Sequence, residues 1–127
     1  RVQADVAREA LAVAYEARRA WFEAVAAEET VRYMLQVREA AEASAELARR
    51  MARAGNYSKL QQMREQVFYA ESTAQLARAQ QAAVAARERL TRLLGLADDR
   101  AFTLPERLPD LPPAPAATTD VAENALR

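Results

Sequence analysis

Residues 51–60 read MARAGNYSKL and separate two long helical patterns. Gly55 and Asn56 are residue types that tolerate the left-handed backbone conformation in which helices often end. Ser58 follows as a candidate N-cap, because its hydroxyl can accept a hydrogen bond from the first turn of a helix. The turn is short, with residues 55–57 at its tip, so we expect the two helices to fold back antiparallel as a hairpin.

The pattern before this turn predicts one helix over about residues 1–54. No Pro occurs before residue 105, and apolar residues recur in alternating steps of three and four with one interruption at Arg38. This seam consists of Val6, Ala10, Val13, Ala17, Ala20, Ala24, Ala27, Val31, Met34, Ala41, Ala45, Ala48 and Ala52. A repeat near 3.5 residues indicates a left-handed coiled coil. A second stripe on a neighbouring face consists of Tyr33, Val37, Ala40, Ser44, Leu47 and Met51.

The second helix, over about residues 58–94, also carries two stripes. One consists of Leu60, Met63, Val67, Ala70, Ala74, Ala77, Gln81 and Val84. The other consists of Tyr69, Ser72, Leu76, Ala79, Ala83, Ala86, Leu90 and Leu93. A two-stranded coiled coil needs one seam per helix. The two stripes therefore predict an additional helical neighbour, while an Ala-rich face left in water is the alternative.

Composition excludes several classes of site. The 127 residues include no Cys and no His, so disulfides, Cys-His or Ser-His-Asp catalysis and the usual zinc sites are ruled out. Adjacent acids such as Glu28 and Glu29 point about 100° apart on a helix and share no site. We expect neither enzymatic activity nor a cofactor. Formal net charge is zero, which gives no indication of a nucleic acid partner.

Two features of the chain concern membranes and chain ends. No run of about 18 apolar residues is present, so no membrane-spanning helix is expected. The chain begins with Arg1 inside a helical pattern and shows no signal peptide, so we expect it to be a piece of a longer protein.

Residues 96–117 differ from the helices because all five Pro of the chain lie in this stretch. Gly95 is a candidate C-cap, and Phe102 and several Leu alternate with the prolines, which predicts an extended segment packing along the hairpin. Folding about residue 56 places position i opposite position 112 − i, so the second helix ends opposite Arg18. We expect the Pro-rich segment to cover the first seventeen residues, and residues 118–127 to form a short helix or a frayed end.

Glu and Arg spaced four apart are expected to pair on the outer faces of the helices. These pairs are Glu28–Arg32, Glu46–Arg50 and Glu88–Arg92.

The stretch at residues 47–60, LARRMARAGNYSKL, continues through repeated Ala-x-x-Ala steps to the Leu-Leu-Gly-Leu of residues 93–96. Over about residues 5–111 the chain resembles one of the two repeats of the TolC-type outer-membrane efflux proteins. Ala54, Gly55, Ser58 and Leu60 match the hairpin tip of that family. The chain departs from the family pattern at Met51, where Arg is frequent, and at residues 61–62, where Gln-Gln replaces an Asp followed by Val or Leu.

The resemblance implies a wall segment of a trimeric tunnel in the periplasm and outer membrane of a Gram-negative bacterium. The tips of such tunnels meet a periplasmic adaptor protein, which links the tunnel to an inner-membrane pump. The alternatives are a soluble coiled-coil scaffold and the hairpin of an adaptor (membrane fusion) protein. Lipoyl-like β-domains flank an adaptor hairpin, and the Pro-rich segment after residue 95 disfavours that alternative.

Basic charge gathers at the tip, where Arg49, Arg50, Arg53, Lys59 and Arg64 occur without an acid between them. One interpretation is a docking surface for an acidic partner. The other is that the arginines complement the negative C-terminal end of the first helix. The residues predicted to dock a partner are Arg53, Gly55, Asn56, Tyr57, Ser58, Lys59 and Leu60.

Overall fold

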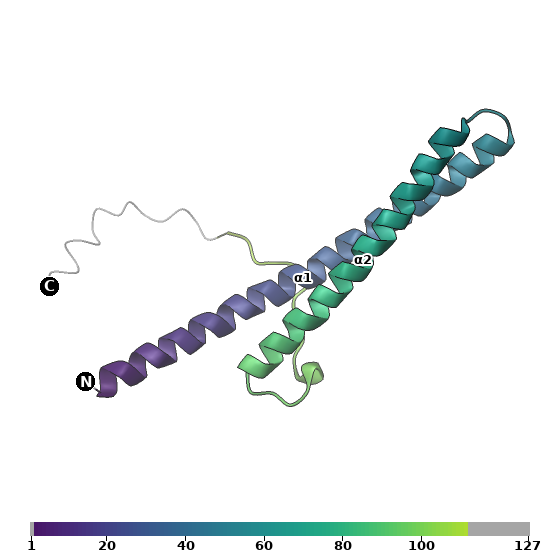
Figure 1. Ribbon diagram of the computed structural model, residues 1–127. Helices are drawn as coiled ribbons and strands as arrows, with labels where there is room; N and C mark the ends of the chain where they lie inside the picture. The colour runs from purple at the N-terminus through teal and green to yellow at the C-terminus, as the bar shows by residue number, and fades with distance from the viewer. Residues whose placement is uncertain (1, 112–127) are drawn as a thin grey trace, which may run out of the picture.

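The computed structural model describes residues 2–111, which form a long helical hairpin (Figure 1). Helix α1 spans Val2–Arg53, helix α2 spans Lys59–Leu93, and a short 3₁₀ helix, η1, spans Asp99–Ala101. Residues 2–111 contain no strand. The predicted all-α antiparallel hairpin is confirmed, and the helix bounds agree with the prediction to within a residue.

The helices pack through the stripes that the 3.5-residue repeat predicted. In α1, five of the six buried residues belong to the predicted seam: Ala20, Ala24, Ala41, Ala45 and Ala48. The sixth, Val25, lies outside that seam. In α2, the apolar core residues come from the stripe that runs from Tyr69 to Leu93, which we call the inner stripe; Ser72, Leu76 and Leu90 are buried. Because most side chains at this contact are Ala, the two helices form a narrow coiled coil with a thin core.

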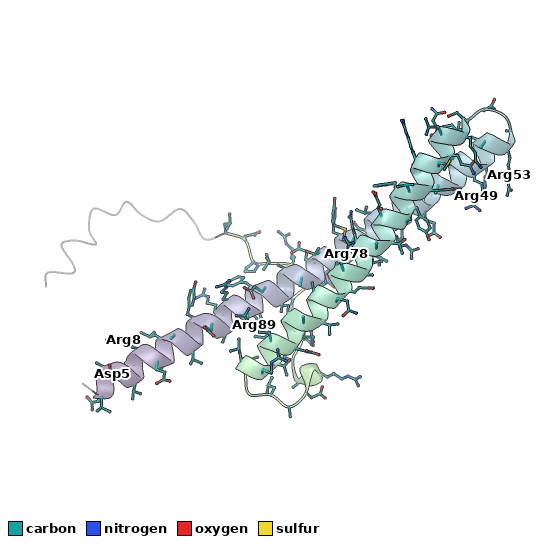
Figure 2. All side chains as sticks on the ribbon, viewed as in Figure 1. Asp5, Arg8, Arg49, Arg53, Arg78 and Arg89 are labelled. Carbon is teal, nitrogen blue, oxygen red and sulfur yellow. The ribbon has the colours of Figure 1, made fainter. Side chains whose placement is uncertain are left out.

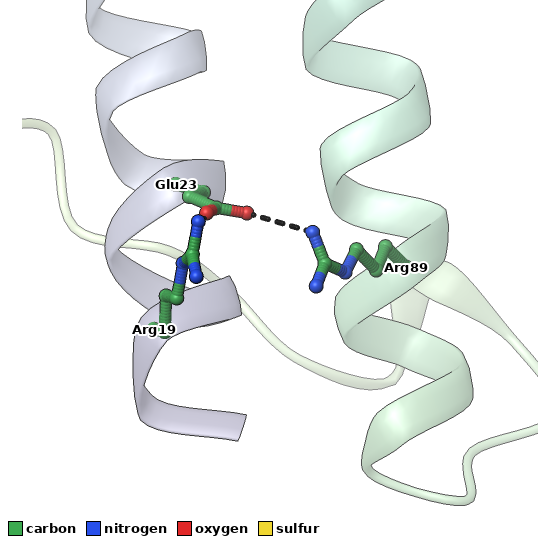
Figure 3. A network of polar contacts seen from close by, with 3 residues as sticks. All are labelled: Arg19, Glu23 and Arg89. Atoms are coloured by element: carbon green, nitrogen blue, oxygen red, sulfur yellow. Dashed lines mark hydrogen bonds and ion pairs between the residues drawn. The ribbon is translucent and has the colours of Figure 1, made fainter. Parts of the chain in front are cut away.

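The register of the hairpin agrees with folding about residue 56. Glu23, which that rule places opposite Arg89, accepts a hydrogen bond from Arg89 at 3.2 Å (Figure 3). Nearer the tip, the Ser44 hydroxyl donates to the Glu65 carboxylate at 2.6 Å. Polar contacts on the rim of the seam therefore join the two helices along their length.

Arg38 is the one charged residue that interrupts the seam of α1. Its guanidinium reaches the carboxylate of Glu42, one turn further along the helix. Its Nε is buried and has no hydrogen-bond partner among residues 2–111. The polar interruption thus weakens the seam locally without ending the helix.

The chain turns back toward the tip after α2. Gly95 has a φ of 67°, and the Leu96 amide donates to the Thr91 carbonyl at 3.0 Å, which ends the helix as expected. Phe102 and Leu104 then pack against Ala20, Ala24 and Leu90, and the Leu108 amide donates to Glu29 at 3.4 Å.

The described part of the Pro-rich segment therefore lies beside residues 20–29 of α1. Residues 2–16 are exposed. For the part of the Pro-rich segment up to residue 111, the expectation that it covers the first seventeen residues is therefore wrong. Residues 112–117 and the short helix or frayed end expected at 118–127 lie outside the described residues.

Arg87 fixes the path of this segment. Its guanidinium donates to Glu28 at 2.8 Å and to the Phe102 carbonyl at 2.7 Å, and it lies 4.7 Å from the centre of the Phe102 ring. One side chain of α2 thus joins α1 and the segment after α2.

The expected pairs Glu46–Arg50 and Glu88–Arg92 form at 2.8 and 3.7 Å. The expected Glu28–Arg32 pair is wrong, because Glu28 bonds to Arg87 of the opposite helix instead.

Candidate functional site: the hairpin tip and an exposed stripe

The tip is closed by hydrogen bonds at the end of α1. The Asn56 amide donates to the Met51 carbonyl at 2.9 Å, and the Gly55 amide donates to the Ala52 carbonyl at 3.1 Å. Gly55 has a φ of 77°, which is the left-handed conformation that this motif requires after a helix. Gly55 therefore adopts the left-handed conformation that the sequence predicted. Asn56 does not, because among the described residues only glycines have a positive φ; it contributes its amide to the turn instead.

Ser58 begins the second helix. Its hydroxyl accepts from the Gln61 amide at 3.2 Å, and the Gln61 side chain accepts from the Ser58 amide at 3.1 Å. This reciprocal pair is a capping box, in which two amides that lack helical partners are satisfied. The predicted N-cap is confirmed. The sequence analysis missed the role of Gln61, although the spacing Ser-x-x-Gln is typical of a capping box.

Three of the predicted docking residues gather around one open hollow at the tip. Arg53, Tyr57 and Lys59 line a space of about 460 Å³. Figure 2 shows Arg49 and Arg53 close together at this end of the molecule. The other lining residues, which the sequence did not single out, are Arg49, Ala52 and Gln62. Leu60 does not line the hollow; its side chain is 60% exposed.

The positive charge at the tip is smaller than the five basic residues of the sequence suggest, because a nearby acid neutralises part of it. Glu46 lies one turn before them and pairs with Arg50 at 2.8 Å and with Arg49 at 3.2 Å. The hydrogen bond from Arg50, together with the charges of Arg49, Arg50 and Arg53, lowers the pKa of the Glu46 carboxyl below its ordinary value. Arg49 and Arg50 are thus partly neutralised.

The remaining basic groups of the tip are Arg53, Lys59 and Arg64. Within residues 2–111 none of these three forms an ion pair. Arg53 also lies in the last turn of α1, where its charge complements the helix dipole. The tip therefore offers an aromatic ring and unpaired cations around a hollow, a combination typical of protein-binding surfaces.

The second notable surface is the other apolar stripe of α2, which we call the outer stripe: Leu60, Met63, Val67, Ala70, Ala74, Ala77, Gln81 and Val84. All eight residues are exposed, with Met63 at 51%, Val67 at 54% and Val84 at 55%. The inner stripe of the same helix is covered by α1, and Leu90 of that stripe is only 1% exposed. The outer stripe therefore lacks a partner among the described residues. Tyr33 and Leu47 of the second stripe on α1 are also exposed.

Neither helix within residues 2–111 has a stretch both long and apolar enough to cross a lipid bilayer. The described residues contain no group of acids arranged to hold a metal ion. Comparisons with protein-family models, with curated proteins and with solved structures found no match to this chain.

Proposed function

We propose that this chain is a periplasmic wall segment of a trimeric outer-membrane efflux channel, and that its tip docks a periplasmic adaptor protein connected to an inner-membrane pump. The observation that carries the proposal is the outer stripe of α2, which repeats regularly from Leu60 to Val84, is apolar except at Gln81, and is exposed. In a closed ring of helices every helix has two lateral neighbours, so each helix needs two apolar stripes.

The dimensions and composition of the outer stripe suit such a ring. Its 25 residues extend over roughly 36 Å of helix. Three consecutive members, Ala70, Ala74 and Ala77, have small side chains that allow a neighbouring helix to approach closely. Large exposed apolar surfaces on proteins usually mark sites of interaction, so a regular apolar row of this length favours a contact with another helix.

The tip supports the docking half of the proposal. Tyr57 supplies an aromatic contact beside the hollow, and Arg53 and Lys59 supply positive charge for an acidic partner surface. A soluble coiled-coil scaffold requires neither this hollow nor a second apolar stripe, so the two functions predict different effects of substitutions at these positions.

The lateral contact is tested with Ala74→Glu in the full-length protein. A buried, unpaired carboxylate between neighbouring helices should abolish the trimer and the export of toxic compounds. The matched control is Ala82→Glu, at an exposed alanine of α2 that belongs to neither stripe. Native mass spectrometry measures the oligomer. Intact trimers in both variants would contradict the proposal that the outer stripe of α2 packs against a neighbouring helix in a channel wall.

The docking surface is tested with the double substitution Arg53→Glu and Lys59→Glu. Recovery of the adaptor in a pull-down should fall at least tenfold while the trimer persists. The control is Arg32→Glu with Arg100→Glu, which changes the net charge equally at exposed positions far from the tip. Equal adaptor recovery in the two double variants would reject the docking role.

A further inference from the structure

The outer stripe of α2 is bordered on one side by a row of exposed charged residues. Arg64, Glu71 and Arg78 are seven residues apart, and each directly follows a residue of the stripe, which places them on one flank of it. The opposite flank of the stripe carries no charge between residues 60 and 84; its residues are Gln66, Thr73 and Gln80. The charges beside the outer stripe therefore lie on one side and alternate in sign.

These three residues have no opposite charge to pair with inside the described hairpin. Within residues 2–111 none of them forms an ion pair. Elsewhere the helices pair such charges within one turn, as Glu46 does with Arg50 at 2.8 Å. The positions three and four residues away from the charged row are all uncharged: Leu60, Gln61, Val67, Phe68, Ala74, Gln75, Gln81 and Ala82. The row is thus built without partners on its own helix.

The interface between α1 and α2 shows how this chain pairs charges beside a seam. Glu23 borders the seam of α1 and Arg89 borders the inner stripe of α2, and the two side chains pair across the interface at 3.2 Å (Figure 3). In coiled coils, charges that flank the seam determine which helices associate. A charged row beside an uncovered stripe therefore specifies the charges of the helix that covers it.

We propose that the outer stripe binds a helix whose flank carries an acid, a base and an acid, seven residues apart, against Arg64, Glu71 and Arg78. The seam of this helix is apolar, and it is made of small residues where it meets the alanines of the stripe. A helix that covers the whole stripe has about 25 residues and a length of roughly 36 Å. The inference rests on the proposed function, since it names the chemistry of the neighbour that the outer stripe meets in the channel wall.

Helix α2 of a second copy is a poorer occupant of this surface. In an antiparallel pair, rows on the same flank face each other, as Glu23 and Arg89 do. When two copies of α2 overlap along the whole stripe, Glu71 therefore faces Glu71 of the other copy. Such like-charge contact opposes association. A shift by one heptad brings opposite charges together but leaves one end of the stripe uncovered in each copy.

Helix α1 of a second copy does not supply the required charges either. Its second stripe is bordered on one side by uncharged residues of the seam, which are Met34, Ala41 and Ala48. The residues that border its other side are Gln36, Ala43 and Arg50. Neither border presents an acid, a base and an acid at seven-residue spacing. The helix that fits the outer stripe therefore differs in sequence from both helices of this chain.

The test uses the 127-residue chain and two labelled helical peptides of equal composition. Each has Ala and Leu at its seam positions and a hydrocarbon staple on the opposite face. The first peptide has Glu, Lys and Glu at successive flanking positions on both sides of its seam, so that the order is the same in either orientation. The second has Glu, Glu and Lys. Fluorescence anisotropy should show about tenfold tighter binding of the first peptide, because the second places like charges at two of three contacts.

Three variants of the chain test which residues select the peptide. Glu71→Arg should abolish the preference, because each peptide then makes two attractive contacts and one repulsive contact. The matched control is Glu39→Arg, which changes the net charge equally at an exposed position of α1 and should leave the preference unchanged. Ala74→Glu should weaken the binding of both peptides, because it puts a carboxylate into the apolar seam. Circular dichroism verifies that each variant stays helical.

Equal binding of the two peptides would overturn the inference, while the lateral contact itself is tested separately by the trimer of the Ala74→Glu variant. A preference that persists in Glu71→Arg, or binding of the first peptide that Ala74→Glu does not weaken, would also overturn it. So would a dimer of the unmodified chain that Ala74→Glu dissociates, since the occupant would then be a second copy.

Discussion

The inner and outer stripes of α2 are built from similar residues and differ in their surroundings. Each repeats in steps of three and four and contains Leu, Ala and one or more polar residues, yet Leu90 of the inner stripe is buried and Val84 of the outer stripe is 55% exposed. This difference shows that apolar periodicity specifies a surface suited to a neighbouring helix, whereas burial requires that the neighbouring helix be present. Substitutions in the two stripes should therefore have unequal effects in the isolated chain.

The largest effect is expected at Leu90. Leu90→Ala leaves a cavity against Ala20 and Ala24 and should lower the free energy of unfolding by about 3 kcal/mol. Met63→Ala, which truncates an outer-stripe residue, should change it by less than about 0.5 kcal/mol. Urea denaturation followed by circular dichroism measures both. Equal losses would show that the outer stripe is already covered.

The next effect concerns the inner stripe where the Pro-rich segment joins it. Arg87→Ala removes hydrogen bonds to Glu28 and to the Phe102 carbonyl, and should lower the free energy of unfolding by about 2 kcal/mol. Amide exchange at Leu108 should accelerate as well. Arg92→Ala breaks only an exposed pair with Glu88 and should cost about 0.5 kcal/mol or less. Unchanged exchange at Leu108 would contradict the role of Arg87.

A smaller effect is expected at the turn that brings the inner stripe against α1. A Cβ on Gly55 meets no atom within 4 Å, so the cost of Gly55→Ala comes from its φ of 77° alone, and is about 1 kcal/mol. Gly55→Asn should cost less, because Asn tolerates the left-handed conformation better. If Ala and Asn were equally well tolerated, the turn would have a different backbone from the one described.

The smallest effect is the pH dependence at Glu46, near the tip. Because the pKa of Glu46 is lower in the folded state than in the unfolded chain, its contribution to stability is present above the unfolded pKa and is lost as the pH falls through the folded pKa. The stability difference between wild type and Glu46→Gln should shrink as the solution is acidified. In an Arg50→Gln background this trend should be weaker. A difference that grows on acidification would contradict the assignment.

The sequence predicted the features that depend on local rules. The ends of α1 and α2 follow from Gly55, Ser58 and Gly95, whose conformational and hydrogen-bonding properties act within a few residues. The seam follows from periodicity alone. The pairing of Glu28 with Arg87 could not be predicted by a rule for neighbours on one helix, because Arg87 lies on the other helix.

The path of the chain after Gly95 was also beyond the local rules. It depends on the contact of Phe102 with Arg87 and on the packing of Leu104 against the seam, which exist only once the two helices are paired. At the tip, the position of Tyr57 beside Lys59 follows from the turn, while the partial neutralisation of Arg49 and Arg50 depends on Glu46, outside the basic stretch. The sequence pattern predicts that the outer stripe suits a neighbouring helix. It does not identify that helix, because periodicity depends only on the residues of α2 itself.

The most direct measurement of the central claim is the reactivity of a single cysteine in the outer stripe, since the chain itself has no cysteine. Ala74→Cys and the off-stripe control Ala82→Cys are treated with a maleimide, in the isolated chain and in the full-length protein in cells. We predict that both react in the isolated chain and that only Cys at position 82 reacts in the full-length protein. Equal reaction at position 74 in both settings would contradict the claim that the outer stripe is a helix–helix interface.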